Sequence, residues 1–498
     1  MVVSSTTTTV TVVSLFAVLL RVLVSLGPYS GESTPPKYGD YEAQRHWMEI
    51  TLHVPPSQWY RNSTHNDLSY WGLDYPPLTA YQSYAHGLLF LNSSVPESVA
   101  LHSSRGYESP KSKLLMRSTV LSSDLLIFFP SALYFVYAYR LHVSSVNGNN
   151  AAIGWQLAMI LLNPCLILID HGHFQYNSIS LGLTIGAVAA ILSRHEIVGS
   201  VLFSLALNHK QMSAYFAPAF LGYLLGKCLR RKHPIFEICK LGFAVLGTFA
   251  VIWFPYLHSL EAFSEASVLS RLAPFERGIY EDYVASFWCI SSIIIKWKNL
   301  FSVQSLKIIS FSTTILSFLP SMVHQIGAPS DMGFIYSLLN CSFSFYFFSY
   351  QVHEKSILLP LLPASLLALE EPFAFSWLVH YGMLSMYPLL CRDNLILQYV
   401  TLLLFFVLIY SSLDGSGPVM KRDFFSIRKA LMALSLICSM SLHLVYLVVQ
   451  PPKKYPFLFE ALIMILCFSQ FLIMVIHTNI KQWRLETPSR ISKSRKNI

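Results

Sequence analysis

WGLDYPPLTAY, residues 71–81, lies in a polar segment between two apolar runs, and the rest of the chain is organised around it. Asp74 is its single carboxylate, framed by aromatic residues and followed by Pro76 and Pro77. The two prolines fix φ and remove two backbone donors, so the backbone after Asp74 is stiff. A carboxylate that is held and partly desolvated in this way can serve as a general base. The alternative is that Asp74 only caps a helix that begins near Pro76.

The composition around this stretch is that of a multi-pass membrane protein. Of the 498 residues, 53% are hydrophobic and 12% are charged, whereas a soluble domain carries about 25% charge. The net charge is +9, but no long basic run lies in a soluble domain. We therefore interpret the basic residues as a topology signal and a basic tail, and not as a nucleic-acid surface. All eight cysteines lie in or beside apolar segments, so no disulfide framework holds the polar segment 27–117.

Apolar runs recur along the whole chain without an intervening soluble domain or a visible sequence repeat. The first run, interrupted by Arg21, lacks a basic start and a clear cleavage site, so we interpret it as a transmembrane helix. The runs cover 10–26, 120–138, 153–170, 177–193, 196–207, 211–228, 238–256, 284–296, 305–322, 333–350, 356–369, 373–391, 394–412, 428–449 and 456–477.

The basic clusters predict the orientation of these runs, because cytoplasmic loops are enriched in Lys and Arg. With a cytoplasmic amino terminus, the cluster 230–232 returns to the cytoplasm after six spans. The cluster 421–429 and the basic tail are cytoplasmic only if one later run does not cross. The run 284–296 is too short for a core of ~30 Å, so we expect it to dip into the membrane. This scheme predicts an all-α protein of one domain, residues 1–498, with about fourteen spans, a first lumenal loop (27–119), a second lumenal loop (257–304) and a cytoplasmic tail (478–498).

Four polar clusters lie at the borders of apolar runs, where ionisable groups are costly and are functional by default. The same scheme places all four in the lumen. Together they would put acids at one end of a site and cations at the other, as a reaction needs if it removes a proton from a hydroxyl and expels a phosphate. They are GDYEAQRHW (39–47), DHGHFQYN (170–177), the group Arg271, Arg277, Glu281 and Asp282, and QVHEK (351–355).

Each cluster also has a structural explanation. Asp40 and Glu42 are candidates for solvated acids or for caps of the helix that follows them. The arginines are candidates for interfacial anchors, and 351–355 for a loop salt bridge. His171 and His173 share a face only on a strand, so we expect hydrogen bonds at a turn more than metal ligation.

Five motifs in order resemble the endoplasmic-reticulum dolichyl-phosphate-glucose-dependent glucosyltransferases of asparagine-linked glycan assembly, the ALG glucosyltransferase family of the GT-C superfamily. This resemblance implies the GT-C fold, a multi-pass protein of the endoplasmic-reticulum membrane and a lumenal active site. The motifs are GDYEAQRHWMEIT (39–51), WGLDYPPLTAY (71–81), HGHFQYNSISLGL (171–183), ERGIYEDYVASFWC (276–289) and QVHEKSILL (351–359).

The resemblance also implies roles for residues. Asp74 would be the general base, His353 would lie near the donor phosphate, and Asp40 with Glu42 would form the acidic motif of the first lumenal loop. From charge alone we add Lys355, Arg271 and Arg277 at the donor phosphate. The remaining substrate-site candidates are Trp71, Tyr75, His173, Gln175, Glu281 and Asp282.

The implied substrates are dolichyl phosphate β-glucose and the dolichyl-diphosphate-linked nine-mannose oligosaccharide. Because a β-linked donor gives an α-1,3 product, the reaction inverts and needs a single base. A lipid-phosphate donor leaves no nucleotide diphosphate, so we expect no metal and no cofactor. The sequence does not identify any protein partner.

Within the family, the motifs favour the branch that adds the first glucose over the branch that adds the second. Two departures from the family pattern are Ser286, where Asn is expected, and His209, where Tyr is commoner.

The rival function from another class is a transporter or flippase, but neither an inverted repeat nor paired broken helices are seen. A membrane-bound acyltransferase is a weaker third alternative. The sequons at Asn62 and Asn92 fit a lumenal loop, whereas Asn340 lies inside an apolar run.

Overall fold

The computed structural model describes residues 2–143, 150–257, 268–272, 279, 283–413 and 427–485. Every regular element in these ranges is helical, which confirms the all-α prediction. The chain divides into two compact units. The first unit contains residues 1–276 and 324–334, and the second contains residues 277–323 and 335–498.

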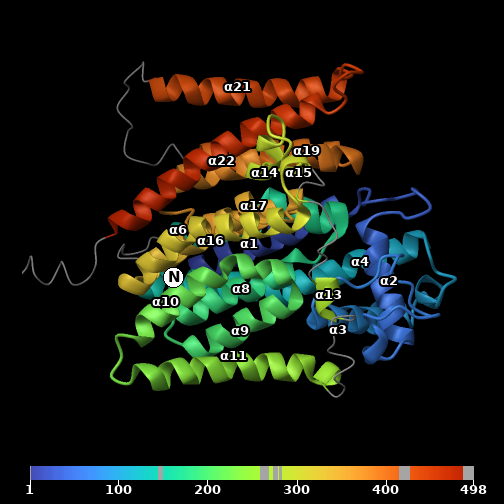
Figure 1. The fold of residues 1–498 in the computed structure, drawn as a ribbon, viewed down its shortest axis with the longest axis horizontal. Helices are drawn as coiled ribbons and strands as arrows, with labels where there is room; N and C mark the ends of the chain where they lie inside the picture. Colours follow the sequence, from blue (N-terminus) through green and yellow to red (C-terminus); the bar gives the residue numbers. More distant parts are fainter. Residues whose placement is uncertain are drawn as a thin grey trace, which may run out of the picture. The chain divides into compact units, whose positions relative to one another are not determined.

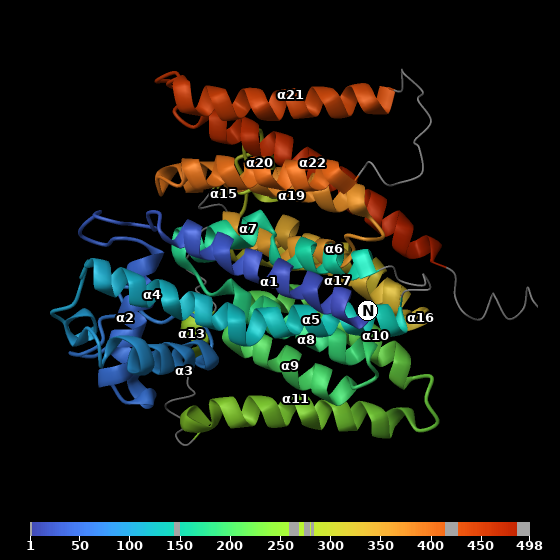
Figure 2. The ribbon, with the colours of Figure 1, turned by 180° about the vertical axis from the view of Figure 1, so that it is seen from behind.

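The helical bundle of the first unit follows the apolar runs of the sequence. Figures 1 and 2 show its helices lying side by side, with α8 against α9 and α5, α9 against α11, and α1 against α6. The helices are α1 (Val2–Ser25), α4 (Pro110–Ser123), α5 (Phe129–His142), α6 (Asn150–Leu161), α7 (Pro164–Ile167), α8 (Asn177–Leu192), α9 (Glu196–His209), α10 (Ala217–Cys228) and α11 (Pro234–Leu257).

Small residues let α8 approach its neighbours closely. A Cβ added to Gly182 would lie 2.9 Å from the Phe128 Cα, and one added to Gly186 would lie 3.1 Å from the Ser131 Oγ. Small residues spaced by four are the usual means of close helix packing in membranes, where the hydrophobic effect does not drive helices together.

A buried ion pair explains the arginine in the first apolar run. Arg21 is fully buried, and its Nε donates to the Asp124 carboxylate while its Nη1 donates to the Leu161 carbonyl at 2.8 Å. The His171 Nε2 lies 3.1 Å from the same Asp124 oxygen. Because a charge inside a bilayer is tolerated mainly when paired, Arg21 and Asp124 tie α1 to the π-helical turn 124–128 that joins α4 and α5.

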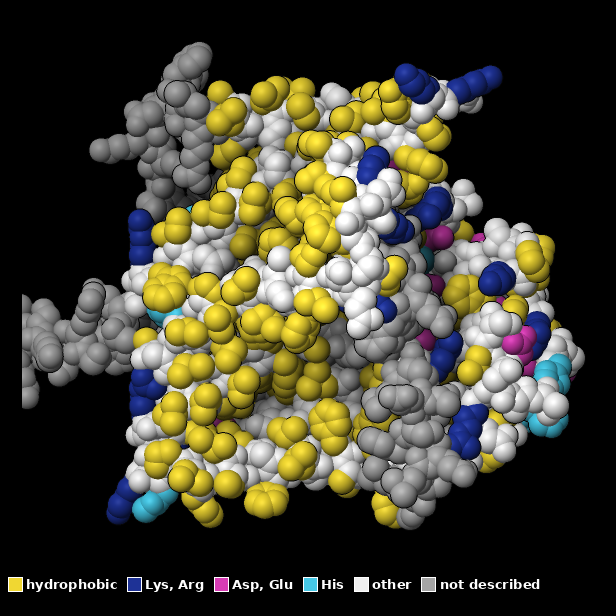
Figure 3. Space-filling view, viewed as in Figure 1, with side chains coloured by type: hydrophobic (Ala, Val, Ile, Leu, Met, Phe, Trp, Pro, Cys, Tyr) yellow, Lys and Arg dark blue, Asp and Glu magenta, His cyan; other side chains and the backbone are white. Residues whose placement is uncertain are grey.

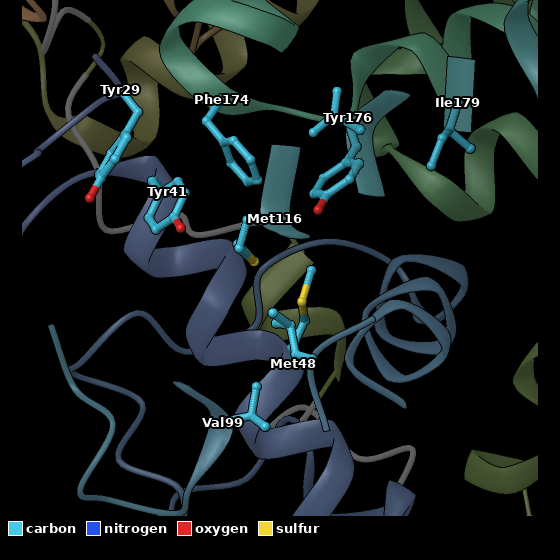
Figure 4. Close-up of a cluster of buried hydrophobic side chains, with 10 residues drawn as sticks. Tyr29, Tyr41, Met48, Val99, Met116, Phe174, Tyr176 and Ile179 are labelled. Carbon is cyan, nitrogen blue, oxygen red and sulfur yellow. The ribbon is translucent and has the colours of Figure 1, made fainter. Parts of the chain in front are cut away.

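The polar segment after α1 folds into its own helices, α2 (Asp40–His53) and α3 (Pro77–His86), followed by α4. The helix α4 begins at Pro110, with the Ser109 side chain as its N-cap, so it starts inside the predicted first loop. Figure 4 shows the apolar cluster that joins this segment to the bundle, with Tyr29 and Tyr41 at one end and Tyr176 and Ile179 at the other.

The second unit is also built from the predicted apolar runs. The run 284–296 forms only the five-residue helix α14, which agrees with the expectation that it does not cross the membrane. The helices are α14 (Phe287–Ser291), α15 (Trp297–Leu300), most of α16 (Val303–Gly327) and of α17 (Asp331–Phe348), α18 (Leu358–Leu366), α19 (Pro372–Arg392), α20 (Ile396–Leu413), α21 (Ile427–Val448) and α22 (Leu458–Arg484).

Polar side chains fasten α16, α17 and α22 to one another. Asn340 donates to the Gln482 side chain at 2.8 Å and accepts from Thr478 at 2.7 Å, while Ser321 donates to Gln482 at 2.7 Å. The amide nitrogen and the amide oxygen of Asn340 are therefore both engaged in a buried network, so this sequon is inaccessible.

Seven helices in the described ranges are long and apolar enough to cross a membrane, and the chain is a multi-pass membrane protein. Other predicted spans correspond to shorter helices, such as α8 with 16 residues and α9 with 14, or roughly 24 and 21 Å. Figure 3 shows hydrophobic side chains over α11, whose Phe243 is 75% exposed, and charged side chains gathered around α2 to α4.

Candidate active site

Asp74 lies in an irregular loop ahead of α3. The helix begins at Pro77, and its N-cap is Pro76, whose side chain makes no capping hydrogen bond. Asp74 is two residues earlier and half-buried. Asp74 is therefore not the N-cap residue of α3; it lies in the irregular loop that leads into the two prolines.

Side chains from other parts of the first unit bind the carbonyl groups of this loop. Each of the five consecutive carbonyls from Trp71 to Tyr75 accepts a side-chain hydrogen bond. The donors are Trp47 Nε1 to Trp71 (2.8 Å), Arg271 Nη2 to Gly72 (3.0 Å), Arg271 Nε to Leu73 (3.2 Å), Gln211 Nε2 to Asp74 (3.1 Å) and the Tyr60 hydroxyl to Tyr75 (2.7 Å).

The loop also begins at a strained residue. Trp71 has a φ of +49°, a region that a bulky side chain rarely adopts. Its indole nitrogen donates to the Lys37 carbonyl, while its own carbonyl accepts from Trp47. Such strain persists only where the surroundings determine the conformation, and it is concentrated at functional sites.

The aromatic ring next to Asp74 contacts a buried cation. Lys210 Nζ lies 4.9 Å from the centroid of the Tyr75 ring, and the Trp47 ring meets the same ring edge-on at 5.3 Å. The neighbouring His209 carbonyl accepts from the Thr79 hydroxyl in α3. The break between α9 and the turn that begins at Gln211 therefore lies directly against the Asp74 loop.

Lys210 also joins this loop to a second acid. Its Nζ donates to the Gln175 Oε1 at 3.0 Å and to the Asn177 Oδ1 at 2.8 Å. The Gln175 amide nitrogen and the His173 Nε2, the latter at 2.9 Å, both contact one oxygen of Asp40. The structure thus brings Asp40 together with His173, Gln175 and Tyr75, and it does so through a lysine that we had not selected from the sequence.

The two histidines of the DHGHF motif point to different partners. The segment Leu168–Phe174 is a π-helical turn, a feature common at functional sites. His171 contacts Asp124 inside the bundle, whereas His173 contacts Asp40 at the border of the polar segment. The expectation of hydrogen bonds at a turn is confirmed. In the described residues, no group of three or more His, Cys, Asp or Glu side chains could hold a metal ion.

Glu42 belongs to a different network from Asp40. Its carboxylate accepts from the Arg45 guanidinium at two positions, both at 2.7 Å, and from the Tyr70 hydroxyl at 2.8 Å. Arg45 also reaches Glu49 at 2.9 Å. Burial acts to raise the pKa of Glu49, but contacts with His46 and Arg45 lower it to about 2. Arg45 is buried and paired with both acids, an arrangement typical of a structural ion cluster.

Two of the remaining predicted site residues, His353 and Lys355, lie in the second unit. His353 precedes a short helical turn, and its backbone nitrogen donates to the Ser356 hydroxyl at 3.4 Å. Glu354 pairs with Arg392 at 3.1 Å, so the acid of the predicted loop cluster has a partner on α19. Lys355 is half-buried. Arg277, Glu281 and Asp282 lie outside the described residues.

One of the two departures from the expected motifs has a local structural role in its side chain. The Ser286 side chain accepts from the Cys289 nitrogen at 3.4 Å and caps α14. His209 is fully buried, and its carbonyl accepts from Thr79 of α3, a contact that does not depend on the side chain; its ring nitrogens have no hydrogen-bond partner among the described residues, so nothing in the structure explains the histidine.

Comparisons with known proteins give consistent results. A sequence model described as "ALG6, ALG8 glycosyltransferase family" matches residues 17–477. An Arabidopsis thaliana protein named "Probable dolichyl pyrophosphate Man9GlcNAc2 alpha-1,3-glucosyltransferase" is 61% identical over 97% of this chain and 91% of its own length. The Gallus gallus protein named "Dolichyl pyrophosphate Man9GlcNAc2 alpha-1,3-glucosyltransferase" is 40% identical over 94% and 96%. A Dictyostelium discoideum relative, also described as a probable enzyme of this kind, is 41% identical over 97% of each chain.

Proposed function

This chain belongs to the ALG6, ALG8 glycosyltransferase family, and we infer that it transfers a glucose residue, in an α-1,3 linkage, to dolichyl-pyrophosphate-linked Man9GlcNAc2. The observation that carries this conclusion is the similarity to relatives with that name over nearly the whole of both chains. The chain is therefore an enzyme that adds the first glucose to the lipid-linked oligosaccharide.

The proposed donor is dolichyl phosphate β-glucose, and the proposed location is the endoplasmic-reticulum membrane with the active site in the lumen. The proposed scheme of about fourteen spans counts the seven long apolar helices and the seven other helices that coincide with predicted apolar runs, α8, α9, α10, α17, α18, α19 and α20. In this scheme the polar segment that carries Asp74 is lumenal, as are the exposed sequon residues Asn62 and Asn92.

In the proposed reaction, Asp74 acts as the general base. Its carboxylate takes the proton of the acceptor mannose 3-hydroxyl while that oxygen attacks C1 of the donor glucose. The C1–O bond to the phosphate breaks in line, the configuration at C1 inverts, and dolichyl phosphate leaves. A half-buried carboxylate on a loop with a fixed backbone suits this role, because the base must be within hydrogen-bond reach of a hydroxyl in one orientation.

The leaving phosphate needs positive charge or hydrogen-bond donors. We assign His353, Lys355 and Arg277 to this end, since a His-Glu-Lys cluster at a lumenal membrane border lies where a lipid phosphate would sit. Trp71, Tyr75, His173, Gln175, Glu281 and Asp282 are the proposed substrate contacts. Asp40 joins them through His173 and Gln175, whereas the contacts of Glu42 favour a structural role.

A transfer assay tests this proposal. The purified chain is incubated with radiolabelled dolichyl phosphate glucose and lipid-linked Man9GlcNAc2, and the released glycan is analysed for a labelled glucose sensitive to an α-1,3-glucosidase. We expect one labelled glucose per glycan. Absence of transfer by a folded, correctly inserted chain, or a β-linked product, would contradict the proposal.

A further inference from the structure

Arg271 contacts the Asp74 loop from a distant part of the sequence. It lies on α13 (Val268–Leu272), a five-residue helix of the predicted second lumenal loop. Its Nε and Nη2 donate to the carbonyls of Leu73 and Gly72, the two residues that precede Asp74. Two N–H groups of a planar guanidinium thus bind two successive peptide groups, which fixes both the position and the direction of the backbone.

The helix α13 is itself firmly attached at this place. So short a helix has little stability of its own. Val268 is 2% exposed and belongs to the same apolar cluster as Leu73 and Trp47, and Leu272 packs against this cluster. The Gln211 amide that donates to the Asp74 carbonyl also points to the Leu272 carbonyl at 3.4 Å. Arg271 therefore connects α13 to the loop at Gly72 and Leu73, and Gln211 connects it at Asp74.

Gly72 provides a separate indication that the arginine approaches closely. A Cβ added at Gly72 would lie 2.9 Å from Arg271 Nη2 and 2.8 Å from the Leu68 Cα. Any larger residue would displace the guanidinium or the loop. The sequence thus has its smallest residue where the cation meets the backbone.

We propose that Arg271 is a positioning residue for Asp74, through which the second lumenal loop holds the general base in its catalytic orientation. This inference rests on the proposed role of Asp74. It differs from the expectation that Arg271 binds the donor phosphate, because a lysine can also bind a phosphate as a point charge, whereas the hold on Gly72 and Leu73 uses two nitrogens of the fork.

The test compares Arg271→Lys with Arg271→Ala in the full-length enzyme, with kcat and the KM for dolichyl phosphate glucose measured per folded molecule. Lys keeps the charge but offers one nitrogen in place of the planar fork, so it cannot reproduce the two hydrogen bonds that Nε and Nη2 make to Leu73 and Gly72 and that fix the direction of the backbone. We expect both variants to lower kcat by roughly 10²-fold, as a displacement of about 1 Å does, with the donor KM within about twofold of the parent. A Lys variant with parent-like kcat, or a main effect on the donor KM, would overturn the proposal.

Two further variants keep the inference testable if Arg271 substitutions fold poorly. Gly72→Ala keeps the arginine in the sequence but displaces its guanidinium or the loop, so it should reproduce the loss of kcat. Gln211→Met removes the donor to the Asp74 carbonyl, and in combination with Arg271→Lys its effect should be smaller than multiplicative, because both act on one loop. Parent-like kcat in Gly72→Ala, or a multiplicative double variant, would contradict the shared mechanism.

Arg230→Lys is the matched control. Arg230 also donates to backbone carbonyls, those of Gly226, Ile326 and Gly327. It lies just before the start of α11, roughly 36 Å from the end of that helix. We expect its kcat to equal that of the parent. Asp74→Asn is assayed alongside: if it is inactive while Arg271→Lys is parent-like, only the positioning role fails, and if Asp74→Asn stays active, the proposed base itself is wrong.

Discussion

Replacing Asp74 by Asn removes the proposed base and leaves the rest of the loop in place. The contacts that fix the loop are made to backbone carbonyls, including that of Asp74 itself, and Asn retains this carbonyl. The side chain keeps its size and much of its hydrogen bonding. Only the ability to accept a proton is lost. A general base contributes typically ~10²–10⁴-fold, or about 3–5 kcal/mol of barrier, so glucose transfer should fall at least roughly a hundredfold.

The assay is single-turnover transfer from dolichyl phosphate glucose to lipid-linked Man9GlcNAc2, normalised to correctly inserted protein. Binding of both lipids should stay close to the parent. Asp67→Asn is the matched control, because Asp67 is a carboxylate of the same polar segment whose Oδ1 accepts from the Ser69 hydroxyl at the surface. This control should retain full turnover.

Variants of Asp40 and Glu42, the two alternative candidates for the base, test the assignment of Asp74. Glu42→Gln should leave turnover per folded molecule unchanged but lower stability by about 1–3 kcal/mol, because it weakens the charged hydrogen bonds to Arg45, which keeps its ion pair with Glu49. If Asp74→Asn keeps near-parent turnover while Glu42→Gln or Asp40→Asn abolishes it, the base has been misassigned and the reasoning from the stiff loop is refuted.

Three further predictions concern other regions. His353→Ala should slow turnover while the protein still folds, since it removes a proposed partner of the departing phosphate; activity equal to the parent would make His353 structural. The lowered pKa of Glu49 stabilises the fold above its ordinary pKa near 4.5, so this stability should be lost as the pH falls toward 2, and Glu49→Gln should melt at a temperature that is less dependent on pH over this interval. Glycosylation acceptors on extended inserts near Ser330 and near Ser416 should stay unmodified, because the proposed scheme makes both cytoplasmic; efficient glycosylation at Ser416 would refute the count of fourteen spans.

Much of the fold could be predicted because it depends on local signals. Apolar runs gave the helices to within a few residues, as for 305–322 and α16 (Val303–Gly327) or 373–391 and α19 (Pro372–Arg392). The interruption of one run by Arg21 was visible, but its partner was not. Asp124 is 103 residues away along the chain, and no periodicity connects the two.

The sequence identified residues of the candidate site by their type, but it predicted only in part which of them lie together. Asp40 and Glu42 are two residues apart, and on a helix such side chains point in different directions. The arginine three residues after Glu42 was a usable sign that Glu42 would be paired. Lys210 had a weaker sign, a single cation between two apolar runs. Its contacts with Gln175 and Tyr75 depend on how α9 ends beside the Asp74 loop, which is a tertiary feature.

The central claim is that this chain adds the first glucose, and a choice between two acceptors tests it most directly. The purified enzyme is given dolichyl phosphate glucose with equal amounts of lipid-linked Man9GlcNAc2 and of the same oligosaccharide already carrying one glucose, and the products are resolved by mass. Our account predicts that the glucose-free acceptor is consumed to a product with a single glucose, while the monoglucosylated acceptor stays unchanged. Extension of the monoglucosylated acceptor alone would contradict it and would assign the chain to the second step.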